Sequence, residues 1–91
     1  MQSKPSKTRT SFYRRIYVAW LIQQGINSVP KLIEATGMPR RTAQDTLAAI
    51  HELAIELKNS GGIYSVINWG AVDQKWVENN IDHLKTVLEY P

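Results

Sequence analysis

Residues 28–53 read SVPKLIEATGMPRRTAQDTLAAIHEL, and this stretch decides the fold. Ser28 is a favourable N-cap residue, and Pro30 is tolerated in the first turn of the helix that follows. Gly37 ends this helix, because the tight reversal after it needs a residue that accepts a positive φ. Another helix is predicted over about residues 39–53. The two helices therefore meet at a short turn.

Small and apolar residues lie where these two helices must touch. Ile33 is on the first helix, and Ala43 and Leu47 are on the second. A large side chain at position 43 would push the helices apart, because packed interiors leave little free space. Two helices joined in this way form a helix-turn-helix, whose second helix can enter the major groove of DNA.

The chain before this stretch predicts a basic arm and one helix. Residues 1–9, MQSKPSKTR, hold no apolar residue beyond Met1 and are predicted to be disordered. A first helix is predicted from Thr10 or Ser11 to about Gln24, with apolar residues at helical spacing.

The chain after this stretch changes from helical to alternating periodicity. Residues 55–58 and 63–69 predict two strands, and Asn59-Ser60-Gly61-Gly62 between them is a strong turn signal. A last helix is predicted from about 70–73 to about Tyr90. Residues 10–70 then form one domain, and residues 71–91 pack on that domain or dimerise.

This order of three helices, a β-hairpin and a C-terminal helix resembles the winged helix proteins of bacterial gene regulation over residues 10–90. The run LIEATGMPRRTAQDTLAAIHEL, residues 32–53, resembles their recognition region. The resemblance implies a mainly α fold with a small β-hairpin, the winged helix-turn-helix. It also implies sequence-specific binding of double-stranded DNA by a transcriptional regulator, with residues 39–53 in the major groove.

Two features depart from the usual pattern of these regulators. Pro39 lies where a Ser or Thr cap is often found, and the tip of the wing carries no Arg. The second departure argues against deep insertion of the wing into the minor groove. A winged helix that lacks a basic recognition face serves instead as a protein-interaction or assembly module, and this is the alternative function.

The charge of the chain is unevenly distributed. Residues 1–41 hold eight basic residues and one acidic residue, a net charge of +7. Residues 42–91 hold three basic and seven acidic residues, a net charge of −4. This asymmetry suggests one face for a polyanion and another face for a different role.

The start of the 39–53 helix carries the main candidates for DNA contact. Arg40 and Arg41 could read a guanine edge and clamp a phosphate, and Gln44 suits adenine. Asp45 either restrains Arg41 through an i, i+4 contact or accepts a hydrogen bond from cytosine. Of these two interpretations, the contact with Arg41 is favoured. Thr42 is expected at a phosphate or in solvent. The predicted set also includes Arg14, Arg15, Lys31, Lys58, Asn59 and Ser60.

The last helix carries an apolar stripe that is wide for one small core, and a homodimer is predicted from it. Its polar face is net acidic and is therefore unsuited to face DNA. In the alternative, the stripe packs against the first helix of its own chain. The predicted interface residues are Trp76, Val77, Ile81, Leu84, Val87 and Leu88.

Other classes of protein find no support in the sequence. The chain has no cysteine, and His51 and His83 lie far apart, so no metal site, cofactor or enzymatic activity is predicted. No stretch has the length of a membrane span, and Met1 to Ser11 lack the apolar run of a secretory signal. A cytoplasmic location is therefore expected, and the sequence does not identify a small-molecule effector.

Overall fold

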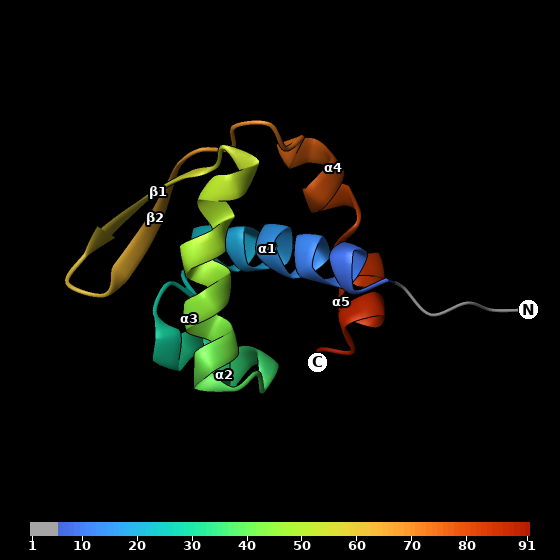
Figure 1. The fold of residues 1–91 in the computed structure, drawn as a ribbon, viewed down its shortest axis with the longest axis horizontal. Helices are drawn as coiled ribbons and strands as arrows, with labels where there is room; N and C mark the ends of the chain where they lie inside the picture. The colour runs from blue at the N-terminus through green and yellow to red at the C-terminus, as the bar shows by residue number, and fades with distance from the viewer. Residues whose placement is uncertain (1–5) are drawn as a thin grey trace, which may run out of the picture.

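The computed structural model describes residues 6–91, and helix α1 (Lys7–Gln23) lies at its centre (Figure 1). Four consecutive residues of α1, Ile16 to Ala19, are buried, so this part of the helix is covered on every side. Among residues 6–91, no helix is both long and apolar enough to cross a bilayer.

The start of α1 lies three or four residues earlier than the sequence pattern predicts. Ser6 is its N-cap residue, and the Ser6 Oγ accepts a hydrogen bond from the backbone N–H of Arg9 at 3.0 Å. The prediction of a disordered arm over residues 1–9 is therefore wrong for residues 7–9, which are helical. The rest of that predicted arm, residues 1–5, lies outside the described residues.

The two helices of the central stretch form as predicted. Helix α2 (Val29–Thr36) is followed by α3 (Arg40–Ala49), which crosses α1 (Figure 1). The last turn of the predicted 39–53 helix tightens into a 3₁₀-helix, η1 (Ile50–Leu53). Short 3₁₀ turns are common at helix ends, because they satisfy the last carbonyl groups.

The predicted hairpin is present as strands β1 (Glu56–Ser60) and β2 (Ile63–Asn68), which pair antiparallel. Gly61 and Gly62 connect them with φ angles of 62° and 89°. Two central residues with positive φ match the right-handed twist of the strands, and most residues other than glycine rarely adopt this backbone conformation. The hairpin is also anchored to the body, because the Tyr64 N–H donates to the Asn27 carbonyl oxygen at 2.9 Å.

The prediction of a single C-terminal helix is wrong. The chain forms two short helices, α4 (Gln74–Asn79) and α5 (Ile81–Leu88), on the other side of the molecule from the hairpin (Figure 1). The break is at Asn80, which leaves the helical conformation with φ −124° and ψ 23°. Its side-chain Nδ2 donates to the Trp76 carbonyl oxygen at 2.7 Å. Asparagine competes with helical hydrogen bonds in this way.

The break changes what the C-terminal apolar stripe can do. Val77 and Leu84 are fully buried and Leu88 is 8% exposed, all within the hydrophobic core of their own chain. Half of the interface predicted for a homodimer is therefore core of the monomer. Of the other three residues, Ile81 and Val87 are half-buried, whereas Trp76 is exposed.

Candidate nucleic-acid interface

The turn between α2 and α3 is fixed by local hydrogen bonds. The buried Thr36 hydroxyl donates to the Leu32 carbonyl oxygen at 2.7 Å and accepts from the Met38 N–H at 3.2 Å. Gly37 between them has a φ of 76° and ends α2. No local pattern in the sequence indicates this bridging role of Thr36. The Thr36 hydroxyl thereby fixes the direction in which α3 leaves the turn.

Helix α3 has one buried side and one exposed side, as the sequence predicts. Ala43 is fully buried and Leu47 is 7% exposed, and α3 packs against both α1 and α2. The other side of the helix faces solvent over its whole length, and Thr42 at its edge is half-buried. The exposed residues are Arg40, Arg41, Gln44, Asp45 and Ala48.

The two arginines at the start of α3 differ in their surroundings. Arg41 Nε lies 3.8 Å from Asp45 Oδ2, the i, i+4 restraint that the sequence favours. Arg40 has no acidic side chain within ion-pair distance among residues 6–91. No side chain caps this end of α3, because its N-cap residue is Pro39. Unbonded amide groups and two cations therefore meet at one helix end, which favours an anion there.

A groove of about 340 Å³ lies between α3 and the hairpin. It brings Gln44 beside Asn59 and Tyr64, which are distant in sequence. Its base is apolar, so the polar side chains stand at its rim. The lining residues that matter for contact are Gln44, Ala48, His51, Leu57, Asn59 and Tyr64.

The three residues predicted at the wing do not lie on one face. Asn59 lines the groove, and its Oδ1 accepts from the Gly62 N–H at 2.9 Å. Successive residues of a strand point to opposite faces. Lys58 and Ser60 therefore lie on the outer face of the hairpin, away from α3. The alternation is visible in the sequence, but the face that meets α3 is not.

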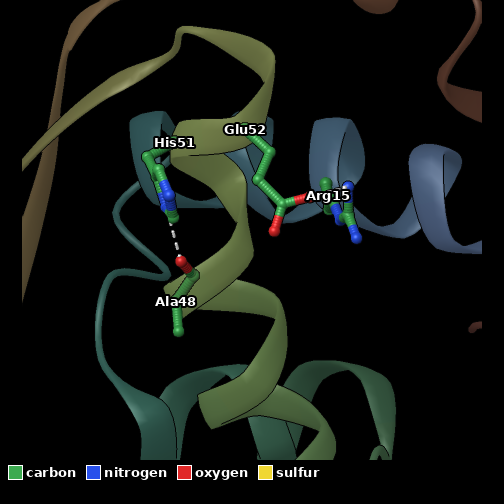
Figure 2. A network of polar contacts seen from close by, with 4 residues as sticks. All are labelled: Arg15, Ala48, His51 and Glu52. Atoms are coloured by element: carbon green, nitrogen blue, oxygen red, sulfur yellow. Dashed lines mark hydrogen bonds and ion pairs between the residues drawn. The ribbon is translucent and has the colours of Figure 1, made fainter.

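His51 is a candidate that the sequence argument missed. Its Nδ1 lies 2.7 Å from the Ala48 carbonyl oxygen (Figure 2). A carbonyl oxygen only accepts, so this Nδ1 carries the hydrogen. The spacing of Gln44, Ala48 and His51 is four and then three residues, which places them on one helical face. That periodicity is the signal that could have identified His51.

The two arginines predicted on α1 contact other parts of the chain, whereas the lysine predicted on α2 is exposed. Arg15 Nη1 lies 3.4 Å from Glu52 Oε1 and joins α1 to η1 (Figure 2). Arg14 Nε donates to the Tyr90 hydroxyl oxygen at 3.1 Å, which ties α1 to the C-terminus. Lys31 is exposed on α2. Arg14 and Arg15 therefore stabilise the fold at positions outside the α3–hairpin groove.

Comparison with known proteins agrees with this architecture. The sequence model described as winged helix-turn helix matches residues 7–88. The crystal structure of a DUF2131 family protein from Shewanella amazonensis SB2B is similar, with a TM-score of 0.86 and 31% sequence identity. The match covers 96% of this chain and 91% of that one. No curated protein matches the sequence. The chain has the α2–α3 helix-turn-helix followed by a hairpin, and the family model matches almost its whole length. The chain therefore belongs to the winged helix-turn-helix family.

Proposed function

We propose that this protein binds double-stranded DNA in a sequence-specific manner and regulates transcription, with α3 in the major groove. The observation that carries the proposal is the start of α3, where Arg40, Arg41 and Gln44 are all exposed to solvent. The second helix of a helix-turn-helix contacts base edges mainly through its N-terminal residues.

The chemistry of each side chain suggests its role in the complex. The guanidinium of Arg41 can donate two hydrogen bonds to the O6 and N7 of guanine, and its contact with Asp45 limits its conformations. The Gln44 carboxamide can pair with the N6 and N7 of adenine. Arg40, next to the uncapped amide groups of α3, suits a phosphate. Lys31, exposed on the preceding helix, would add a further phosphate contact.

The groove between α3 and the hairpin supports a contact with one strand of the duplex. Gln44 faces this groove from α3 and Asn59 faces it from the hairpin, so both can bond to the same bound strand. His51 at the end of the groove adds a third polar group. Contacts to the backbone fix the position of a protein on DNA, and contacts to bases give it sequence preference.

A second candidate function is protein–protein assembly through the hairpin. Ile63 is 47% exposed and Ile67 is 56% exposed, and both lie on the outer face of β2. Exposed apolar residues on a wing without arginine favour contact with another protein over contact with phosphate. This function can coexist with DNA binding, because the outer face points away from α3.

Selection of preferred duplexes from a random pool, followed by binding measurements at two salt concentrations, tests the proposal. We expect one enriched sequence class and an affinity that falls steeply with salt. The Ile63→Ser and Ile67→Ser variants should retain that affinity. If no sequence is enriched and duplex binding is undetectable at low salt, the DNA-binding proposal is wrong and the assembly function is favoured.

A further inference from the structure

An apolar groove of about 350 Å³ lies between the N-terminal half of α1 and α4. In Figure 1 the N-terminal half of α1 and helix α4 lie on the side of α3 away from the hairpin. Two of its aromatic side chains are unusually open to solvent, Phe12 at 37% and Trp76 at 41%. The main lining residues are Phe12, Tyr13, Ile16, Leu53, Val72 and Trp76.

The aromatic rings around this groove support one another. The ring of Tyr13 lies 6.1 Å from that of Phe12 and 6.3 Å from that of Trp76, measured between centroids. His83 adds an edge contact to Tyr13 at 5.7 Å. These neighbours limit the motion of the exposed rings, so a partner that covers them loses little side-chain entropy on binding. An exposed aromatic cluster beside a hollow is typical of an interaction surface.

One acidic residue lines the groove, and a basic residue lies on α1 one turn outside it. Arg9 is exposed on α1, one turn before Phe12 and Tyr13, and α1 contains no acidic residue. Asp73 is exposed and lines the groove at the start of α4. In a two-fold dimer formed through this groove, Arg9 of one copy could pair with Asp73 of the other, and symmetry would then give the reverse pair as well. The charge pattern is thus complementary to itself.

We propose that this face binds a second copy of the chain in a two-fold dimer, with Trp76 of each copy in the groove of the other. An isologous interface needs one patch that supplies both the projecting group and the hollow, and this patch supplies both. The proposal replaces the C-terminal stripe as the dimer interface, since Leu84 and Leu88 are buried. It leaves the exposed side of α3 and the hairpin free.

The consequence of the dimer for recognition rests on the proposed function. If α3 reads DNA, the dimer would present two copies of α3 to the two halves of a palindromic site. The dimer itself does not depend on DNA binding. Its test is therefore made in the absence of DNA, so that the two proposals succeed or fail separately.

Sedimentation equilibrium of the full chain across the micromolar range is the experiment. We expect a reversible dimer for the wild type and a monomer for Trp76→Glu, which should stay folded by circular dichroism because Trp76 is exposed. Gln24→Glu is the control, since it adds the same charge at an exposed residue at the other end of α1, outside the groove. This control should dimerise like the wild type.

Two conservative variants test the charge pairing. Asp73→Asn keeps an oxygen that can cap α4, where Asp73 Oδ1 accepts from the Lys75 N–H at 3.0 Å, but removes the charge. Asp73→Asn and Arg9→Gln each remove two symmetry-related exposed ion pairs, so each should weaken the dimer about two- to thirtyfold. A wild type that is monomeric throughout, or a Trp76→Glu variant that still dimerises, would overturn the proposal. The first result would leave the groove to a different partner.

Discussion

The starts of α2 and α3 are opposite in character, although the two helices are neighbours in one motif. At α2 the Ser28 Oγ accepts from the Lys31 N–H at 3.4 Å, and a proline occupies the first turn. At α3 no side chain caps the helix, and two arginines oppose the helix dipole. The N-terminus of α2 is thus stabilised by its cap. The N-terminus of α3 lacks this stabilisation, and a bound anion could accept the hydrogen bonds that a capping side chain would otherwise accept.

This contrast predicts that α2 and α3 respond differently to substitution. Changes at the cap and the buried residues of α2 should alter the free energy of unfolding and leave the intrinsic affinity for DNA unchanged. Changes at the exposed start of α3 should do the reverse. Four predictions follow this division, from the largest expected effect to the smallest.

Leu32→Ala should cause the largest loss of stability. Leu32 is fully buried in α2, and removing a buried leucine side chain costs about 2–5 kcal/mol of unfolding free energy. Urea denaturation followed by circular dichroism measures this loss. Glu34→Ala, on the exposed side of the same helix, is the control and should change stability by less than about 0.5 kcal/mol. An equal loss in both variants would mean that α2 does not pack as described.

Arg41→Ala and Gln44→Ala should each weaken binding to the preferred duplex by about 1–3 kcal/mol and relax its sequence preference. Both side chains are exposed, so the unfolding free energy should change little. Fluorescence anisotropy on matched and mismatched duplexes gives both quantities. Lys75→Ala on α4 is a control for the loss of a distant exposed cation. If the variants keep the wild-type preference, α3 does not read bases.

Ser28→Ala should destabilise the protein by about 1 kcal/mol, because it removes the N-cap oxygen of α2. Ser28→Thr keeps a hydroxyl at this position and should recover most of the stability. Neither variant should change the affinity for DNA under conditions in which the protein is fully folded. A selective loss of DNA affinity in Ser28→Ala would show that the start of α2 also takes part in binding.

Arg40→Glu should have the smallest effect on stability, and in the opposite direction. An acidic side chain in the first turn of α3 interacts favourably with the helix dipole, which should stabilise the protein by about 0.3–1 kcal/mol. The same change should abolish the proposed phosphate contact and weaken DNA binding. Thermal denaturation and duplex binding are compared on one preparation. Reduced stability together with unchanged DNA affinity would contradict the role assigned to this helix end.

The features predicted correctly from the sequence depend on residues close together in the chain. Ser28 as a cap, Gly37 at the end of α2 and the Gly61-Gly62 turn all act within one turn of backbone. The restraint of Arg41 by Asp45 spans only four residues. Such features can be predicted without knowledge of the rest of the fold, because caps and turns depend on local sterics and local hydrogen bonds.

The sequence therefore determined by itself the order of the elements up to the hairpin, the helix-turn-helix, and the exposed side of α3. Only the tertiary structure decided which residues outside α3 are accessible to a partner and which are buried or paired within the chain. Arg15 pairs with Glu52, 37 positions away, and Arg14 with Tyr90, 76 positions away. The burial of Leu84 likewise depends on the turn at Asn80, which lets α5 pack on α1. Burial and long-range pairing arise from segments distant in the chain, and no local pattern specifies which segments meet.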